Sequence, residues 1–272
     1  MGNSRPILFF DSGIGGISYC RHFHERNPAV PVVYLADRLH FPYGTKKPDE
    51  VISILTALVE QIIPIVDPQI FVIACNSAAV SALAPLRERF PQLPFVGVIP
   101  AVKPAALAST SGKIGVLATE RTVNDPYIRE LAAQFGGGEI VGIAAPELAE
   151  FLERHFVTAT AEEKLEIARR YLSRFRAAGV DTLVLGCTHF LFLADEFRKE
   201  AAPDITIFES LEGISRRVES LLAGSAAEAG AAAEIAVAAP NRLLLTGSSP
   251  AETSWQDWAD RLGFNLLLLE DA

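Results

Sequence analysis

The sequence predicts an α/β fold with two similar α/β units and largely parallel sheets. Short apolar runs of strand length alternate along the 272 residues with longer amphipathic runs of helix length, which is the pattern of repeated strand–helix–strand units. The pattern also repeats weakly. A strand ending at Asp11 is followed by one ending at Cys75, and a strand ending at Thr119 is followed by one ending at Cys187. Strand–turn–helix units look alike in many proteins, so this repeat on its own leaves a single large domain open.

Ten strands are expected, each a short apolar run that ends at a polar or turn residue. They lie at residues 6–10, 30–36, 70–74, 95–99, 113–118, 139–144, 181–186, 204–208, 242–247 and 264–270. Longer amphipathic runs between them predict helices at residues 48–63, 77–90, 122–135, 161–178, 210–222 and 250–262. "ISYCRHFHE", residues 17–25, is a further helix. "GSAAEAGAAAEIAVAAP", from residue 224, indicates a flexible surface excursion or a weak helix.

Composition narrows the classes of function. A net charge of −9 argues against a general nucleic-acid binder or a binder of anionic membranes. No apolar stretch reaches the roughly 18–20 residues of a membrane span, and the N-terminal residues lack a cleavable signal pattern. Three widely spaced cysteines without a CxxC pair fit reduced thiols in a cytoplasmic protein better than disulfides or a zinc site.

Two of the cysteines stand in matching frames. "IACNSA" (73–78) and "LGCTHF" (185–190) place Cys75 and Cys187 directly after an apolar strand and before small polar residues. The carboxyl ends of parallel strands carry the sites of open α/β sheets, and helix N-termini there favour a thiolate. Cys20 lacks this context and is expected to be a buried structural residue. Two thiols that face one ligand from opposite sides suit two-base chemistry, in which one thiolate removes a proton from carbon and the other thiol returns one.

Two glycine-containing turns support small-anion binding without indicating a nucleotide. "DSGIGG" (11–16) allows a tight strand-to-helix turn whose N–H groups can hold a carboxylate or phosphate. It is neither a P-loop nor a dinucleotide fingerprint. "FPYGTK" (41–46) combines proline, an aromatic ring and glycine, which predicts a turn. Taken alone, such a turn indicates a structural role rather than a binding site. No motif for a cofactor is present, so none is expected.

Taken in order, "FDSGIGGIS", "YLADRLHFPYGTK", "IACNSA", "VGVIPAVKPA", "GVLAT" and "LVLGCTHF" closely resemble the glutamate racemases of the cofactor-independent aspartate/glutamate racemase superfamily. The resemblance covers about residues 7 to 222. It implies interconversion of L- and D-glutamate in the cytoplasm, supplying the D-isomer for bacterial peptidoglycan. It also implies two domains, residues 1–97 plus 213–272 and residues 98–212, with the active site in the cleft between them. Relatives form dimers, so a homodimer is implied as well.

The resemblance assigns roles residue by residue. Cys75 and Cys187 match the two acid/base thiols, Cys187 acting on L-glutamate and Cys75 on D-glutamate. Asp11 and His189 match polar partners that help the nearer thiol exchange protons, and Asp37 and Glu153 are further candidates for this shell. The positions that hold the amino acid are matched by Asp11, Ser12, Tyr43, Gly44, Asn76, Ser77, Thr188 and His189.

The residues themselves fit this assignment. Neither cysteine motif contains Lys or Arg, so N–H groups, hydroxyls and the Asn76 amide would neutralise the substrate carboxylates. Keeping cations away preserves the basicity that proton abstraction from carbon needs. His189 could instead be a structural imidazole or a metal ligand, but no second His or Cys stands at ligand spacing, so no metal site is expected.

Three positions depart from the family pattern: Ser77 replaces a usual Thr, Leu191 a usual Pro and Glu209 a usual Asp. Serine keeps the hydroxyl, whereas Leu191 is expected to loosen the loop beyond Cys187; Glu209 has no functional interpretation. Three alternatives stay open: racemisation of aspartate or a hydantoin, decarboxylation of a malonate, and an amino-acid-binding protein without turnover. Such decarboxylases need only one cysteine, so the presence of both favours a racemase.

Overall fold

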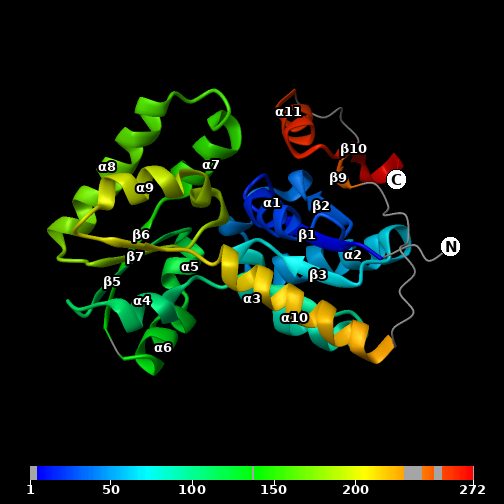
Figure 1. Cartoon of the computed structure of the whole chain (residues 1–272), viewed down its shortest axis with the longest axis horizontal. Coiled ribbons are helices and arrows are strands. Elements are labelled where there is room, and N and C mark those ends of the chain that lie inside the picture. The colour runs from blue at the N-terminus through cyan, green and yellow to red at the C-terminus, as the bar shows by residue number, and fades with distance from the viewer. Residues whose placement is uncertain (1–4, 137, 230–240, 248–252, 272) are drawn as a thin grey trace. The chain divides into compact units, whose positions relative to one another are not determined.

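The computed structural model describes residues 5–136, 138–229, 241–247 and 253–271, and Figure 1 labels its helices and strands along the chain. By spatial proximity the chain divides into two compact units, one formed by Met1–Val98 with Leu211–Ala272 and the other by Ile99–Ser210. Each contains a parallel sheet with helices between its strands. The predicted α/β class with parallel sheets is therefore confirmed.

The first unit is built on a six-stranded sheet in the order β10-β9-β2-β1-β3-β4. All five strand pairings are parallel. The sheet draws its strands from both ends of the chain, because β9 pairs with β2. The strands are β1 (Ile7–Asp11), β2 (Val32–Ala36), β3 (Ile70–Ile73), β4 (Phe95–Gly97), β9 (Arg242–Leu245) and β10 (Asn265–Leu268).

Helices cover both faces of this sheet. Leu8 and Phe10 of β1 belong to a core shared with α2 and α3, whereas Phe9, pointing the other way, packs on Phe23 of α1 with ring centroids 5.6 Å apart. The helical elements, labelled in part in Figure 1, are α1 (Ile17–Arg26), η1 (Arg38–His40), η2 (Tyr43–Thr45), α2 (Pro48–Val66), α3 (Asn76–Arg89), α10 (Leu211–Ala229), α11 (Thr253–Leu262) and η4 (Leu269–Asp271).

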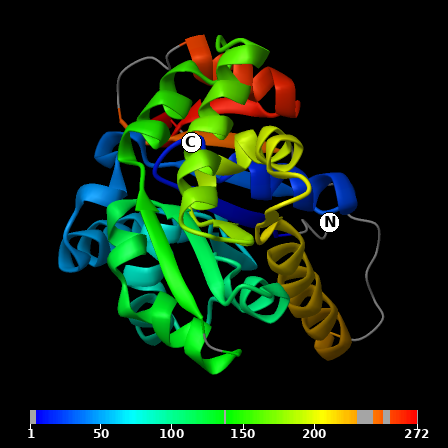
Figure 2. The ribbon, with the colours of Figure 1, turned by 90° about the vertical axis from the view of Figure 1, so that its left-hand side faces the viewer.

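The second unit has a four-stranded parallel sheet in the order β6-β5-β7-β8, whose strands run side by side in Figure 2. Its strands are β5 (Lys113–Ala118), β6 (Glu139–Ala144), β7 (Thr182–Leu185) and β8 (Thr206–Phe208). Its helical elements are α4 (Val102–Ala108), α5 (Glu120–Asn124), α6 (Pro126–Gln134), α7 (Pro146–His155), α8 (Ala161–Ala177), η3 (Thr188–Leu193) and α9 (Ala194–Ala201).

All ten predicted strands are present, whereas the helices differ from the prediction in three ways. The expected helix over residues 122–135 is two, α5 and α6, because Pro126 forces Asp125 into extended backbone, from which its side chain caps α6. The short helices α4, α7 and α9 were not predicted. Helix α10 continues past residue 222 to Ala229, and residues 230–240 of the alanine-rich stretch lie outside the described residues. None of the helices described here is both long and apolar enough to cross a membrane.

Candidate active site

The carboxyl ends of three neighbouring strands bring together the predicted residues of the first unit. Asp11, the last residue of β1, pairs in register with Ala36 of β2, and Phe10 pairs with Ile73 of β3. The N–H of Ala74 continues the ladder by donating to the Phe10 carbonyl at 2.7 Å. Asp11, Asp37 and Cys75 therefore leave adjacent strands at one edge of the sheet.

The turn after β1 is tight because α1 starts against the strand ends. A Cβ added to Gly16 would lie 2.9 Å from the Cβ atoms of both Asp11 and Ala74, so only glycine fits there. Within the turn, the Gly13 N–H and the Ser12 hydroxyl donate to Asp11 Oδ1 at 3.3 and 3.2 Å. At least part of the predicted anion-binding capacity of "DSGIGG" is thus used by the carboxylate of Asp11 itself.

Cys75 occupies the N-cap position of α3. Its backbone is extended, with φ −127° and ψ 115°, and the side chain is only 6% exposed. The positive end of the α3 dipole and the N–H groups of its first turn stabilise negative charge at this point. Asn76 and Ser77, which follow, are buried. The side-chain oxygen of Asn76 is buried and lacks a hydrogen-bond partner among the described residues, so it is available to a ligand.

Tyr43 lies beside Cys75 and Asp11. It is 1% exposed, and its hydroxyl donates to Asp37 Oδ2 at 2.5 Å. Burial raises the pKa of Tyr43 far above its usual value; the charge of Asp37 and the hydrogen bond to it raise it further, and the Cys75 and Asp11 charges add to the shift. The phenol therefore stays neutral and a hydrogen-bond donor. Gly44 follows it in η2.

Cys187 occupies the corresponding position in the second unit. It follows β7 and precedes η3, with φ −129° and ψ 136°, and it is 5% exposed. Gly186 permits this approach, since a Cβ there would lie 3.0 Å from the Cβ of Ala118 on β5. Thr188, the first residue of η3, is buried. The segment after Cys187 is a six-residue 3₁₀ helix rather than an α-helix.

His189 forms a buried link between Cys187 and Glu153. Its Nε2 lies 2.7 Å from Glu153 Oε2 and its Nδ1 lies 3.9 Å from Cys187 Sγ. Burial by itself lowers the pKa of His189, but the hydrogen bonds and charges of Cys187 and Glu153 outweigh it and raise that pKa well above the usual value. The raised pKa favours a protonated His189 beside this thiol, although neither cysteine motif contains Lys or Arg. Glu153 is supplied by α7, one of the helices that the sequence did not predict.

Cys20 behaves as expected of a structural thiol. It is fully buried in α1, and burial raises its pKa far above the usual value, which keeps it protonated. No group of three His, Cys, Asp or Glu side chains suited to a metal ion occurs among the residues described.

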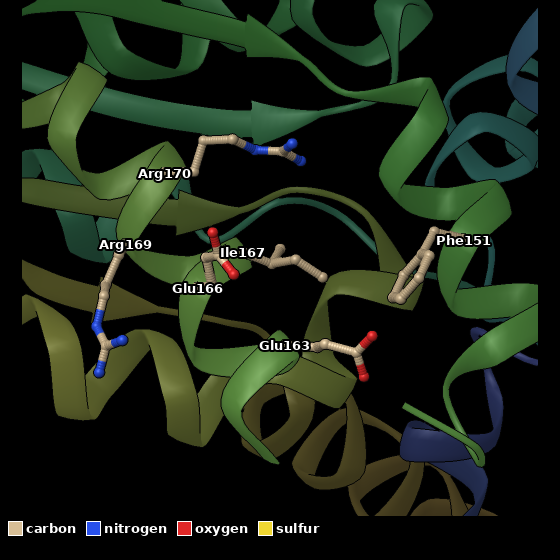
Figure 3. A pocket seen from close by; sticks show the side chains of 6 residues that line it. All are labelled: Phe151, Glu163, Glu166, Ile167, Arg169 and Arg170. Atoms are coloured by element: carbon tan, nitrogen blue, oxygen red, sulfur yellow. The ribbon is translucent and has the colours of Figure 1, made fainter. Parts of the chain in front are cut away.

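A separate cavity in the second unit does not contain the thiols. Figure 3 shows this cavity of about 610 Å³ between α7 and α8, lined by Phe151, Glu163, Glu166, Ile167, Arg169 and Arg170. Arg169 is paired with Glu162 and Glu200, and Glu163 closes the capping box of α8 with Thr160. Arg169 and Glu163 therefore serve to hold the helices, and the thiols lie outside this cavity, so we assign it no role in the chemistry.

The three departures from the family pattern are accommodated locally. Ser77 is buried in the first turn of α3. Leu191 is buried within η3, where its carbonyl accepts the N–H of Ala194; leucine therefore does not interrupt the helical backbone, and its effect on rate stays a prediction. Glu209 lies 3.3 Å from the guanidinium of Arg198.

One polar residue at the edge of the first sheet was missed. Thr246 follows β9 directly and donates its hydroxyl to Asp37 Oδ1 at 2.7 Å. The signal was present in "LLLTG", a strand ending in a hydroxyl residue like the other strands of this sheet edge. It was overlooked because the C-terminal segment lies about 200 residues from the other members of the site in sequence.

Comparison with known proteins places this geometry among racemases. The profile described as Asp/Glu/Hydantoin racemase matches residues 12–213. Glutamate racemases from Treponema pallidum (strain Nichols) and Sphingopyxis alaskensis are 40% and 39% identical, over 80% and 85% of this chain and 84% and 87% of theirs. The Escherichia coli glutamate racemase in complex with L-glutamate and the activator UDP-MurNAc-Ala superposes with a TM-score of 0.83 at 31% identity, covering 97% of both chains. An isoform from Bacillus anthracis gives 0.78 at 28%, covering 98% and 97%.

Proposed function

The chain belongs to the Asp/Glu/hydantoin racemase family and is an isomerase, and on that premise we propose that it interconverts L- and D-glutamate by two-base proton transfer at the α-carbon. The relatives at about 40% identity are named glutamate racemases. We further propose that the D-glutamate supplies peptidoglycan synthesis in the cytoplasm, as the family resemblance implies.

One observation carries the mechanism. Cys75 and Cys187 have nearly the same backbone conformation, and each is the last residue before a helical segment at the carboxyl end of a parallel strand. Both thiols are almost fully buried, which keeps water from competing for their protons. An enzyme that used one nucleophile would need only one such position.

The proposed step is symmetric. The thiolate of one cysteine takes the α-proton of glutamate, and the electron pair of the broken C–H bond stays on the α-carbon and its carboxylate. The thiol of the other cysteine then gives its proton to the opposite face. The configuration inverts, and the two cysteines exchange protonation states until solvent restores them. Cys187 would deprotonate L-glutamate and Cys75 D-glutamate, with His189 and Asp11 as the respective proton-exchange partners.

Binding of the substrate is proposed to use amide, hydroxyl and N–H groups of the first unit together with the carboxylate of Asp11, and a hydroxyl and an imidazole of the second unit. The Asn76 side-chain oxygen, which has no hydrogen-bond partner among the described residues, can accept from the substrate, and the N–H groups of the first turn of α3 and the neutral Tyr43 phenol can donate to it, with Ser12, Gly44 and Ser77 completing this subsite. Thr188 and His189 would contribute from the second unit. We propose that the substrate lies between domains of residues 1–97 plus 213–272 and 98–212.

A direct assay tests the function. Purified protein is incubated with L-glutamate and, separately, with L-aspartate, and the D-isomers are measured by chiral chromatography. We expect turnover of glutamate and little or none of aspartate, unchanged after dialysis against a chelator or treatment with hydroxylamine. Aspartate turnover equal to that of glutamate would move the proposal to another racemase, and activity restored only by pyridoxal phosphate would exclude the two-thiol mechanism. A variant carrying both Cys75→Ala and Cys187→Ala is the negative control.

A further inference from the structure

Side chains from three stretches of the first unit meet at the carboxylate of Asp37. Asp37 is completely buried. Its Oδ2 accepts the hydroxyl of Tyr43 at 2.5 Å and its Oδ1 accepts the hydroxyl of Thr246 at 2.7 Å. The Nδ1–H of His40 is shared between the two oxygens, 3.0 Å from Oδ1 and 2.9 Å from Oδ2. A buried carboxylate needs such donors, because burying charge without partners is costly.

Thr246 is itself fixed by the loop that follows β2. Its own N–H donates to the Ala36 carbonyl at 3.1 Å, its hydroxyl accepts the Leu39 N–H at 3.2 Å, and its carbonyl accepts from Arg38 Nε at 2.8 Å. Since every polar atom of Thr246 is engaged, its hydroxyl has one orientation, with the hydrogen directed at Asp37. The returning C-terminal segment thereby holds a carboxylate located 209 positions earlier in the chain.

We propose that Thr246 is a positioning residue, which acts through Asp37 to hold the phenol of Tyr43 at the sheet edge beside Cys75. This inference rests on the proposed function of the site. Tyr43 touches Asp37 directly, and the Cys75 and Asp11 charges both act on it. Removing the threonine hydroxyl leaves Oδ1 with the longer, shared contact to His40 Nδ1, so the carboxylate is held less firmly, and the phenol and the adjoining Gly44 would shift with it.

The surroundings of Asp37 allow this contact to be removed without unfolding the unit. Asp37, His40 and Thr246 line a cavity of about 370 Å³ whose wall also contains polar Ser53 and Gln61 and apolar leucine and isoleucine side chains. Water at the polar side of this cavity can hydrogen-bond to Asp37 Oδ1 when the threonine hydroxyl is absent. It would not fix the orientation of the carboxylate, because a water lacks the backbone attachments of Thr246.

The test compares Thr246→Val, which keeps the shape and removes the hydroxyl, with Thr246→Ser, which keeps the hydroxyl. Thr182→Val is the matched control, since the buried Thr182 hydroxyl has no hydrogen-bond partner in the described parts of the chain. We expect Thr246→Val to raise the KM for glutamate about five- to thirty-fold, with a smaller change in kcat. Thr246→Ser and Thr182→Val should stay within twofold of the wild type.

A double-mutant cycle separates positioning from general support of the fold. If Thr246 acts through Tyr43, Thr246→Val adds less than twofold to KM in a Tyr43→Phe background. A wild-type KM in Thr246→Val, or full additivity with Tyr43→Phe, would overturn the inference. If circular dichroism shows that Thr246→Val is unfolded, Asp37→Asn replaces it in the same cycle and must meet the same criterion. A wild-type protein that does not racemise glutamate would instead refute the proposed function.

Discussion

Cys75 and Cys187 have nearly the same backbone conformation at their strand ends. They differ in the groups that surround the sulfur. Cys75 caps the fourteen-residue α3 and has a carboxylate, Asp11, and a neutral phenol, Tyr43, for neighbours. Cys187 precedes a six-residue 3₁₀ helix and lies beside the imidazole of His189, which also contacts Glu153. We expect the dipole of α3 to stabilise negative charge on Cys75, and the His189–Glu153 pair to stabilise it on Cys187.

This difference shows that matching sequence frames need not carry matching electrostatics. At Cys75 the favourable field comes from backbone dipoles, which do not titrate. At Cys187 we expect it to depend on the protonation of His189, whose pKa is raised by its contacts with Cys187 and Glu153. We therefore expect the two sides of the proposed reaction to respond differently to substitution and to pH.

The largest expected effect comes from removing one thiol at a time. Cys75→Ala and Cys187→Ala should each lower racemisation by about 10³-fold or more, because a proton-transfer group is lost. Each should keep one-sided exchange of the α-hydrogen with D₂O, favouring L-glutamate in Cys75→Ala and D-glutamate in Cys187→Ala. Proton NMR over long incubations measures the exchange. Equal exchange of both isomers in both variants would mean that one base reaches both faces.

The next effect distinguishes the two electrostatic environments. L- and D-glutamate have equal free energy in water, so kcat/KM must be equal in both directions for every variant, and steady-state ratios cannot reveal a one-sided defect. Exchange of the α-hydrogen with D₂O in the single-thiol variants can reveal such a defect, because each variant keeps only one of the two bases. His189→Asn should slow L-glutamate exchange about 10²-fold in the Cys75→Ala background and leave D-glutamate exchange in the Cys187→Ala background within threefold. A similar loss on both sides would contradict the assignment of His189 to Cys187.

Alkylation provides a smaller, substrate-free comparison. Iodoacetamide should modify Cys75 and Cys187 and spare Cys20, whose pKa is raised by complete burial. His189→Asn should slow modification of Cys187 about tenfold and leave Cys75 unchanged, because only Cys187 loses a neighbouring cation. Peptide mass spectrometry follows each site, and Cys20→Ala is the control with unchanged activity. If loss of activity instead paralleled modification of Cys20, the assignment of Cys75 and Cys187 as the catalytic thiols would be wrong.

The smallest expected effect is on stability. The folded-state pKa of His189 is raised above its unfolded value, so its contribution is complete below about pH 6.5 and is lost as pH rises through the folded pKa. The difference in unfolding free energy between wild type and His189→Asn, about 1–2 kcal/mol at pH 6, should therefore shrink in alkaline solution. Urea unfolding at several pH values measures it. In Glu153→Gln the pH dependence should be weaker, and a difference that grows with pH would have the wrong sign.

Sequence reasoning succeeded where the controlling interactions are local. Apolar runs located all ten strands, and the residues directly after them placed Cys75 and Cys187 at strand ends. It failed where a feature depends on a distant residue or on fine local geometry. The 3₁₀ helix after Cys187 differs from an α-helix in its hydrogen-bond spacing, and the raised pKa of His189 depends in part on Glu153 from the short helix α7. The contact between Asp37 and Thr246 joins residues that no local pattern connects.

The first sheet is assembled from both ends of the chain, and this has a consequence for biosynthesis. Its central strands leave the ribosome early, but β9 and Thr246 follow only after the whole second unit has been translated. At about 5–20 residues per second, the partner of β2 arrives roughly 10–40 s after β2 itself. During that interval β2 has an unpaired edge and Asp37 lacks its threonine donor. A nascent chain therefore carries both cysteines before it carries the support for Tyr43, and the site is completed only when the last strands dock.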